Sequence, residues 1–235
     1  MGNDIRIGGF QECSFCDYPN KTASVIFMQG CNLRCRYCYN RALLSMESED
    51  TRTGDWLLEK LKLMKGKVSG IVLTGGEPLC QGVDNVCDVF EYARYFGFFT
   101  KLDTNGMFPE RLNDLIKKKV HIDYIAIDLK AGSDKLYKEL CGQNASLANV
   151  LESISIVKKS GIPFELRTTV IDGFHTDKEM EKVFALAMDS TLYLQPFKRM
   201  GEAEKCPDDW TEPSVNRIRN LVKLASDFDC VCLKR

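Results

Sequence analysis

Short apolar stretches alternate along this chain with longer segments in which apolar residues recur every three or four positions. The β-branched and aromatic run at residues 22–29 is typical of a buried strand, and residues 55–65 space leucines and a methionine as one face of a helix requires. The same reasoning predicts further strands at residues 68–74, 98–103, 122–129, 164–171, 192–197 and 230–233, and helices at 83–96, 109–119, 147–159, 176–188 and 213–228.

This order amounts to about six strand-then-helix units, which predicts an α/β fold with a parallel sheet and right-handed crossovers. A chain of 235 residues fits one domain. We expect residues 1–21 to be an N-terminal extension, 22–200 the core, and 201–235 a C-terminal helix and strand. No G-x-G-x-x-G follows a predicted strand, which counts against a dinucleotide-binding open sheet. In open sheets and barrels alike, ligands bind at the carboxyl ends of the strands.

The predicted strand ends are unusually polar. A cysteine-rich segment follows the first strand, and each later strand runs into charged, amide or glycine residues. In chain order these segments are Thr74-Gly75-Gly76-Glu77-Pro78, Asp103-Thr104-Asn105-Gly106, Asp128-Leu129-Lys130, Arg167-Thr168-Thr169 and Gln195-Pro196-Phe197-Lys198. We therefore expect the functional site at this end of the sheet.

Composition narrows the class of protein. The formal net charge of -1 gives no support to binding nucleic acid or an anionic membrane. No apolar run approaches the ~18 residues of a membrane helix, and the first residues lack the apolar segment of a secretory signal. Eleven cysteines, an odd number, without an export signal indicate reduced thiols rather than a disulfide scaffold. We expect a cytoplasmic protein.

Cys31, Cys35 and Cys38 are the most informative residues. Three thiolates spaced three and then two residues apart, directly after a predicted strand, fit one loop wrapped around one metal centre. Soft thiolate ligands select zinc or an iron–sulfur cluster. A structural zinc site needs four protein ligands, yet the next cysteine is Cys80 and the nearest histidine is His121. Three cysteines can instead hold a [4Fe–4S] cluster with one iron open to a ligand, although a partial zinc site remains the alternative.

This spacing, with Tyr37 just before the last cysteine, resembles the signature of the radical S-adenosylmethionine (SAM) enzymes. The resemblance implies an open-sided, partial (β/α)6 barrel of parallel strands with outer helices. It also implies that Cys31, Cys35 and Cys38 hold a [4Fe–4S] cluster whose open iron chelates SAM. Residues implied to bind the cofactor are Tyr37, Tyr39, Asn40, Gly75, Gly76, Glu77, Asp103, Thr104, Asn105, Asp128, Lys130, Arg167 and Gln195.

Several of these residues also have an expectation from their chemistry. Gly75 and Gly76 would let the backbone approach a ligand closely, and Glu77 would accept from an ammonium group. Asp103 and Asp128 end successive strands, so their carboxylates should lie near each other and need protonation, a paired cation or a bridging one. The resemblance implies a monovalent cation held by Asp103, Thr104 and Asp128. It also assigns Lys130 and Arg167 to the cofactor carboxylate and the ribose region, although Lys130 could equally be a solvated lysine.

Further motifs indicate the branch of the family. Ile7-Gly8-Gly9-Phe10-Gln11, Asp17-Tyr18-Pro19, Lys101-Leu102-Asp103-Thr104-Asn105-Gly106 and Arg167-Thr168-Thr169-Val170 look like the activating proteins of anaerobic ribonucleoside-triphosphate reductase. The Asp-Thr-Asn-Gly and Asp-Leu-Lys elements are shared with pyruvate formate-lyase activating enzyme. The resemblance implies an enzyme that generates a glycyl radical on a partner enzyme and takes electrons from a flavodoxin- or ferredoxin-type donor.

Two alternatives stay open. A radical SAM enzyme acting on a small molecule, similar to 7-carboxy-7-deazaguanine synthase, shares the Thr-Gly-Gly-Glu-Pro run but usually has an Asp-Thr pair where this chain has Tyr39-Asn40. A zinc or iron–sulfur module without turnover is the second. No general base is needed for radical chemistry, which fits a chain with two histidines, and we expect His175 to be a loop residue before a helix in which Thr176 and Glu179 form a capping box.

The remaining cysteines are expected to be unligated thiols, since free cysteine behaves as a small hydrophobe. The residues concerned, for which a second metal site stays open, are Cys13, Cys16, Cys206, Cys230 and Cys232.

Overall fold

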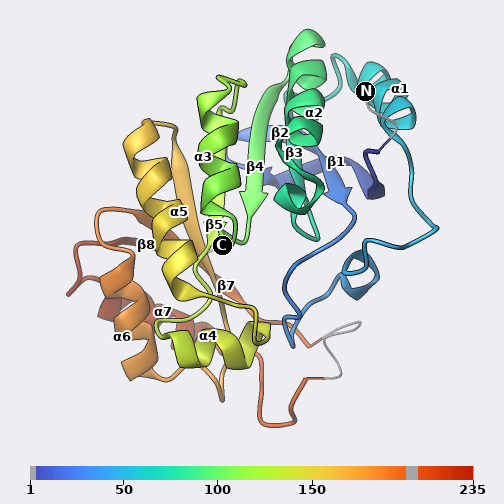
Figure 1. The fold of residues 1–235 in the computed structure, drawn as a ribbon. Coiled ribbons are helices and arrows are strands. Elements are labelled where there is room, and N and C mark those ends of the chain that lie inside the picture. The colour runs from blue at the N-terminus through green and yellow to red at the C-terminus, as the bar shows by residue number, and fades with distance from the viewer. Residues whose placement is uncertain (1–3, 200–205, 235) are drawn as a thin grey trace.

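The computed structural model describes residues 4–199 and 206–234 (Figure 1). Eight strands form one sheet in chain order: β1 (Ile7–Tyr18), β2 (Lys21–Met28), β3 (Gly70–Gly75), β4 (Phe99–Thr104), β5 (Tyr124–Asp128), β6 (Phe164–Val170), β7 (Thr191–Pro196) and β8 (Val231–Lys234). β1 is antiparallel to β2, and every later neighbouring pair is parallel. The predicted α/β architecture with parallel strands is confirmed.

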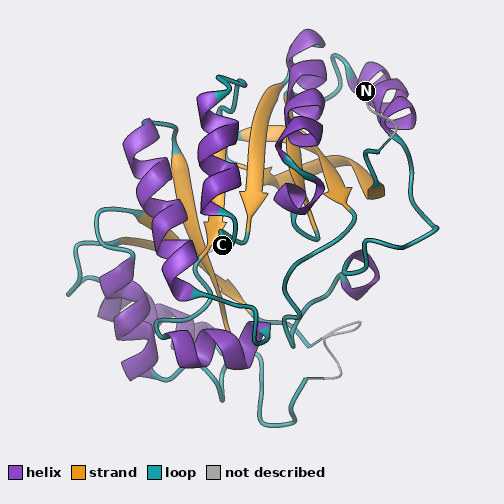
Figure 2. Cartoon of the chain, viewed as in Figure 1, coloured by secondary structure: helices purple, strands orange, loops and turns teal. Residues whose placement is uncertain are grey.

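The crossovers are helical, as Figure 2 shows. They comprise α1 (Gly54–Met64), α2 (Val83–Tyr95), α3 (Pro109–Lys117), α4 (Asp134–Cys141), α5 (Leu147–Ser160), α6 (Asp177–Leu186) and α7 (Val215–Ala225), with short 3₁₀ turns η1 (Arg41–Leu43) and η2 (Pro78–Gln81). None of the helices in the described residues has the length and apolar character needed to cross a membrane.

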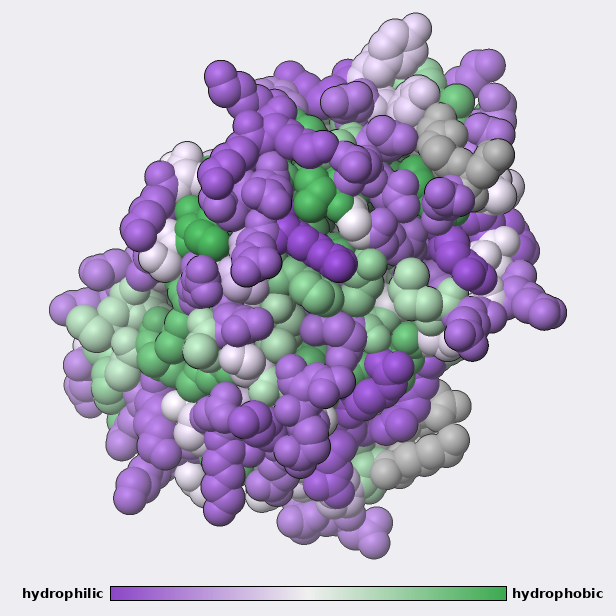
Figure 3. Space-filling model, in the orientation of Figure 1, coloured by the Kyte–Doolittle hydropathy of each residue, from purple (hydrophilic) through white to green (hydrophobic). Residues whose placement is uncertain are grey.

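Two apolar clusters stabilise this arrangement. The larger one lies between the helices and the outer face of the sheet and includes Leu57, Phe90 and Phe184. A smaller one, of Tyr18, Ala23, Val25 and Val72, lies on the other face, at the end of the barrel opposite the strand carboxyl ends. The space-filling view shows mostly polar side chains on the helical face, interrupted by small apolar areas (Figure 3). This cluster does not fill the part of the inner face near the carboxyl ends of the strands, and that part is therefore the space available to a ligand.

The structure differs from the expectations in two elements. Residues 1–21 contain β1, a paired member of the sheet, rather than only an extension. Register shifts on either side of Ser14 interrupt the pairing of β1 with β2. Its side chains therefore do not alternate regularly between the two faces of the sheet, and its sequence lacks the two-residue period of a regular strand. Helix α4 was not predicted, because it has only eight residues. Residues 201–205 of the expected C-terminal segment lie outside the described residues.

The capping box before α6 is half formed. The Thr176 side chain accepts from the Glu179 backbone N–H, as expected for an N-cap. The Glu179 carboxylate, however, accepts from the Gly132 N–H at 2.6 Å instead of returning to Thr176. Glu179 is buried, and it ties α6 to the loop that follows β5.

Candidate functional site

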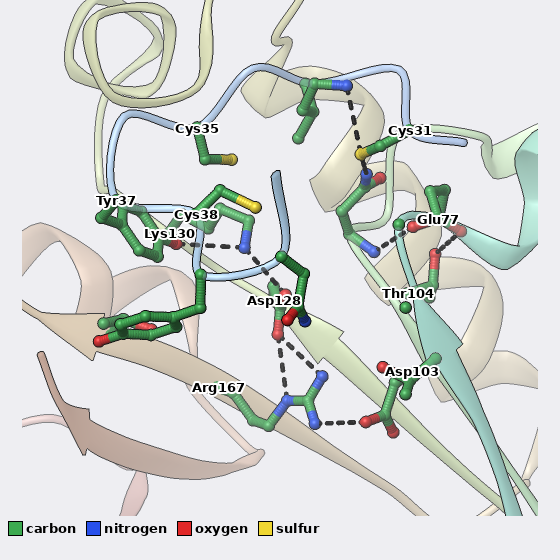
Figure 4. A pocket seen from close by; sticks show the side chains of 18 of the residues that line it. Cys31, Cys35, Tyr37, Cys38, Glu77, Asp103, Thr104, Asp128, Lys130 and Arg167 are labelled. Carbon is green, nitrogen blue, oxygen red and sulfur yellow. Dashed lines mark hydrogen bonds and ion pairs between the residues drawn. The ribbon is translucent and has the colours of Figure 1, made fainter. Parts of the chain in front are cut away.

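One cavity of about 670 Å³ lies at the carboxyl ends of the strands, and every residue predicted for the cluster or the cofactor lines it (Figure 4). Its volume is in the ordinary range of small-molecule sites, roughly 300–1,000 Å³. Cys31, Cys35 and Cys38 lie on one side of this space, on the loop that follows β2. The charged ends of β4, β5 and β6 lie on the other side.

The cysteine loop is anchored by backbone hydrogen bonds to three parts of the chain. Gly30 N–H donates to the Leu43 carbonyl at 2.7 Å, which joins the loop to η1. Arg34 N–H donates to the Cys141 carbonyl at 2.9 Å, which joins it to the end of α4. Glu77 N–H donates to the Gly30 carbonyl at 2.8 Å and links the loop to the end of β3. The three thiols are therefore presented by a fixed backbone.

Gly75 and Gly76 make this packing possible. Gly75 has φ +113, and a Cβ there would lie 2.7 Å from the Met28 carbonyl oxygen. A Cβ on Gly76 would lie 2.7 Å from the carbonyl carbon of Gly30, closer than real side chains come. We expected these glycines to admit a ligand; in the structure, the space that their missing side chains leave is filled by the backbone of β2 and the cysteine loop.

Glu77 connects the ends of β3 and β4. Its carboxylate accepts from the Thr104 hydroxyl at 2.8 Å, the Asn105 N–H at 2.7 Å and the Leu79 N–H at 3.1 Å. Glu77 is 1% exposed, and burial raises its pKa to about 7 against the opposing effect of these donors. A carboxylate has about four acceptor positions, so one remains for a ligand's ammonium group.

Arg167 lies between the two carboxylates that were expected to be neighbours. Its guanidinium donates to Asp103 at 2.7 Å and to Asp128 at 3.0 Å. Each carboxylate also has a lysine: Lys101 pairs with Asp103, and Lys130 donates to Asp128 at 2.9 Å. The bridging cation in this structure is thus a side chain, and a monovalent ion at Asp103, Thr104 and Asp128 stays a prediction.

The charged side chains at the strand ends stabilise one another in their ionised forms. Burial raises the pKa of Asp128, but Lys130 and Arg167 outweigh burial and lower it to about 2. Burial would lower the pKa of Lys130, yet the Asp128 carboxylate holds it well above its usual value. The Lys130 ammonium also donates to the Tyr37 hydroxyl at 3.2 Å. Lys130 is therefore a paired, mostly buried cation rather than a solvated lysine.

The other predicted residues lie around the mouth of the cavity. Asn105 donates to the Asn32 side chain at 2.9 Å and lies 3.9 Å from the Cys31 sulfur. Tyr39 stacks on Phe197 with ring centroids 6.4 Å apart, and its hydroxyl accepts from the Lys198 N–H. Asn40 precedes η1 without a side-chain cap bond, and Gln195 lines the wall from β7. These contacts place the residues; their roles toward a cofactor stay predictions.

Sequence reasoning missed several residues at the site. Lys101 is completely buried and pairs with Asp103; in the sequence it was named only as part of the motif at residues 101–106, without a role at the site. Asp17 and Phe27 line the cavity from β1 and β2. Asp17 was recognised only as part of the Asp17-Tyr18-Pro19 motif. It was not placed at the site, because β1 itself was not predicted.

The donor set fits an iron–sulfur cluster better than zinc. Within residues 4–199 and 206–234, no three His, Cys, Asp or Glu side chains converge as ligands of one ion. A four-iron cluster does not require convergence, because each cysteine binds a different iron. Arg41 supplies a further observation: its Nε is buried and has no hydrogen-bond partner in the described chain, next to the loop carbonyl of Arg36 that its Nη2 bonds at 2.8 Å. An unused cationic donor beside the loop suits the anionic cluster that three thiolates would hold.

The thiols of the loop differ in their surroundings. Burial raises the pKa of Cys31 to about 12, with a smaller opposing effect of the Leu33 N–H. A hydrogen bond from the Cys141 thiol lowers the pKa of Cys35 to about 7 in spite of burial. Burial also raises the pKa of Cys38. Metal coordination deprotonates such thiols outright.

The remaining cysteines are dispersed. Cys13 and Cys16 are exposed on β1, Cys230 directly precedes β8, and Cys232 lies in it. Cys206 is buried, and its thiol donates to the Arg36 carbonyl at 3.1 Å. All are free thiols in the structure.

His175 is a buried loop residue whose two ring nitrogens are both occupied. Nδ1 accepts from the Ile171 N–H and Nε2 donates to the Lys130 carbonyl, each at 3.0 Å. The expectation that it is a loop residue before a helix is confirmed, and both its hydrogen bonds are to backbone groups.

Comparison with known proteins agrees with this geometry. The Radical SAM superfamily matches residues 25–187. A Methanocaldococcus jannaschii protein, itself named only provisionally as a glycyl-radical enzyme activating enzyme, is 34% identical over 94% of this chain and 92% of its own length. Pyruvate formate-lyase 1-activating enzyme of Escherichia coli is 29% identical over 85% of this chain and 78% of its own.

Solved structures share the fold. Streptococcus suis SuiB bound to its precursor peptide SuiA superposes with a TM-score of 0.72 at 13% identity, over 90% of this chain and 48% of SuiB. A domain of pyruvate-formate lyase-activating enzyme from Bacteroides vulgatus superposes with a TM-score of 0.59 at 17% identity, over 71% of this chain and 99% of that domain. The expected radical SAM partial barrel is confirmed by these neighbours. From the family match and the identity over nearly the whole chain, the protein belongs to the radical SAM superfamily and, within it, to the glycyl-radical enzyme activating enzymes.

Proposed function

We propose that this enzyme holds a [4Fe–4S] cluster through Cys31, Cys35 and Cys38 and binds SAM in the adjoining cavity. It then generates a glycyl radical on a partner, which we take to be an anaerobic ribonucleoside-triphosphate reductase. The observation that carries the proposal is that the three thiols and the charged strand ends line the same cavity. When bound and reduced, the cluster would supply the electron for cleavage of SAM to methionine and a 5′-deoxyadenosyl radical, and this radical would take a hydrogen atom from the glycine Cα.

The chain's own side chains would place SAM between the thiols and the strand ends. Glu77 offers its remaining acceptor position to the amino group, while Lys130 and Arg167 offer positive charge to the carboxylate. Tyr37 and Tyr39 line the cavity on the side of the cysteine loop. Placement and shielding are what a protein adds to a cofactor that carries the difficult chemistry.

Abstraction of a hydrogen atom by a radical needs no general base. Neither histidine lines the cavity, and His175 uses both ring nitrogens on backbone groups. The electron donor that we propose is a flavodoxin- or ferredoxin-type protein. The location that we propose for the enzyme is the cytoplasm.

The partner has a second candidate. Pyruvate formate-lyase activating enzymes of Escherichia coli and Streptococcus mutans are 29% and 27% identical to this chain, each over 85% of it. That similarity favours a pyruvate formate-lyase-type partner as the alternative to the reductase.

One experiment tests the function and separates the partners. The reconstituted, reduced enzyme is mixed with SAM and either an anaerobic ribonucleotide reductase or a pyruvate formate-lyase. We expect an oxygen-sensitive doublet in electron paramagnetic resonance with the reductase, and deuterium from Cα-deuterated glycine in the 5′-deoxyadenosine. A radical only on the lyase would keep the class and change the partner. Deuterium arriving only from an added small molecule would overturn the proposal.

A further inference from the structure

The end of β5 is held by a side chain at a place where a strand would otherwise pair with it. The last pair between β4 and β5 joins Thr104 to Ile127, and β4 ends there. The Tyr137 hydroxyl, from α4, then donates to the Asp128 carbonyl at 2.9 Å and accepts from the Lys130 N–H at 3.2 Å. A residue of a parallel neighbouring strand makes the same two bonds, to a carbonyl and to the N–H two residues later. The Tyr137 hydroxyl therefore continues the ladder beyond the end of β4.

The intervening residue is held from the other side. Leu129 N–H donates to the Arg167 carbonyl at 2.9 Å, and the Leu129 carbonyl accepts from the Thr168 hydroxyl at 2.6 Å, both on β6. Tyr137 is completely buried, so its hydroxyl does not exchange partners with bulk water. Residues 128–130 are thus fixed by β6 along one edge and by Tyr137 along the other.

This short segment carries two charged side chains of the cavity. Asp128 and Lys130 are two positions apart, so their side chains lie on the same face of the strand, and both line the cavity. The Lys130 ammonium donates to the Asp128 carboxylate at 2.9 Å and to the Tyr37 hydroxyl at 3.2 Å (Figure 4). A displacement of the Lys130 backbone would therefore move the ammonium away from both partners.

α4 also holds the cysteine loop. One helical turn after Tyr137, the carbonyls of Leu140 and Cys141 accept from the N–H groups of Arg36 and Arg34, both at 2.9 Å. The rise of an α-helix is fixed at about 1.5 Å per residue, so the spacing between these contacts and Tyr137 is fixed as well. The same helix thus bonds to two walls of the cavity, the loop that bears the three thiols and the end of β5.

We propose that Tyr137 is a positioning residue for SAM binding: its hydroxyl holds the Lys130 ammonium at a fixed place relative to the cysteine loop, where the ammonium meets the carboxylate of the ligand. The inference rests on the proposed function, because that function places SAM in this cavity. Tyr137 does not line the cavity, so it acts through Lys130 and not by contact with the ligand. A loosely held Lys130 would have to be ordered on binding, which lowers affinity.

Amide exchange in the reconstituted protein, before SAM is added, tests the positioning itself. The Lys130 amide should exchange about fivefold faster or more in Tyr137→Phe than in wild type, because its acceptor is lost. Hydrogen–deuterium exchange read at single residues by mass spectrometry measures this rate. Tyr18→Phe is the matched control, since Tyr18 is also buried and its hydroxyl donates to the Thr100 carbonyl at 3.3 Å, away from the cavity. Unchanged exchange of Lys130 in Tyr137→Phe overturns the inference.

Isothermal titration with SAM tests the consequence for the ligand. Tyr137→Phe should bind SAM about fivefold more weakly with its iron content unchanged, and Tyr18→Phe should bind as wild type does. In a Lys130→Met background, Tyr137→Phe should weaken binding by about twofold or less, because the group through which it acts is absent.

This double variant separates positioning from a general loss of structure. Losses of affinity that multiply in Lys130→Met with Tyr137→Phe would mean that Tyr137 acts independently of Lys130, and they overturn the inference. A wild type that does not bind SAM overturns the proposed function and with it the ligand named here. The exchange rate of the Lys130 amide, measured without SAM, decides the positioning in either case.

Discussion

Arg167 donates from its guanidinium to the Asp103 carboxylate at 2.7 Å, across the inner face of the barrel from β6 to β4. The same guanidinium reaches Asp128 at 3.0 Å. Since Lys101 and Lys130 each pair with one of these carboxylates, neither depends on Arg167 alone for a positive partner. Arg167 can therefore turn toward a ligand's carboxylate without leaving a buried charge unpaired, which an isolated buried ion pair would not allow.

Arg167→Met should weaken SAM binding about tenfold or more, because a charge-assisted contact contributes roughly 1.5–3 kcal/mol. Isothermal titration of the reconstituted protein measures the affinity. Arg217→Met is the matched control, since Arg217 pairs with Asp172 at 3.3 Å and does not line the cavity. Equal affinities for Arg167→Met and wild type would contradict the role proposed for Arg167.

Glu77→Ala and Asp103→Ala should also weaken SAM binding, again by about tenfold or more, while leaving the iron content unchanged. Glu77→Ala has an additional expected effect, because it leaves the donors of Thr104 and Asn105 without their buried acceptor. It should lower the free energy of unfolding by about 1–3 kcal/mol. Urea unfolding and titration of SAM measure the two effects separately, and unchanged SAM affinity in both variants would show that the strand ends are not the binding site.

Cys31→Ala, Cys35→Ala and Cys38→Ala should each abolish reductive cleavage of SAM, because three thiolates are needed to hold the cluster. Reconstituted wild type should bind about four irons per chain, counted by iron and sulfide analysis. Cys13→Ser and Cys16→Ser are the controls, since both residues are exposed on β1 and do not line the cavity. Normal cleavage by any one of the three alanine variants would remove that residue from the cluster.

The position of the site could be predicted from the sequence because it depends on the ends of strands. The strands themselves show as apolar runs, and the polar residues that follow them are adjacent in sequence. Parallel pairing then brings such ends to one edge, as Asp128 beside Arg167 in the β5–β6 register shows. Predicting this edge required no knowledge of side-chain directions.

The pairing within the site could not be predicted, because it depends on register and side-chain direction. Asp103 lies opposite Ala126 in the β4–β5 register, so the small side chain leaves room for Arg167 to reach across. β1 was missed because its bulges break the alternation that marks a strand. The packing of Gly76 on Gly30 is a contact between loops, which no periodic pattern records.

Gly76→Ala should displace the cysteine loop. The added Cβ would lie 2.7 Å from the Gly30 carbonyl carbon and 2.9 Å from the Leu43 carbonyl oxygen, both backbone atoms with no side-chain freedom to move. We expect a loss of stability of about 1–3 kcal/mol and reduced iron content after reconstitution. Gly9→Ala is the control, because its Cβ would make ordinary contacts with Phe27 at 3.5 Å. Full iron content in Gly76→Ala would show that the loop tolerates a shift.

His175 makes stability depend on pH through its two hydrogen bonds. Because Nδ1 accepts from the Ile171 N–H, a proton added there would face another donor. Burial lowers the pKa of His175 to about 4, and the positive charge of Arg217 acts in the same direction. The unfolded chain takes up this proton near pH 6.5, so below that pH the unfolded state binds more protons than the folded one.

The free energy of unfolding should therefore fall as pH drops from 6.5 toward 4, by about 1.4 kcal/mol per pH unit from this residue. His175→Asn removes that contribution, although it also costs stability at neutral pH because the bonds to Ile171 and Lys130 change. The deficit of the variant relative to wild type should then be about 2 kcal/mol smaller at pH 5 than at pH 7.5. Urea unfolding of both proteins at the two pH values measures this double difference, in which other titrating groups cancel. An equal deficit at both pH values would mean that His175 titrates alike in the folded and unfolded chains.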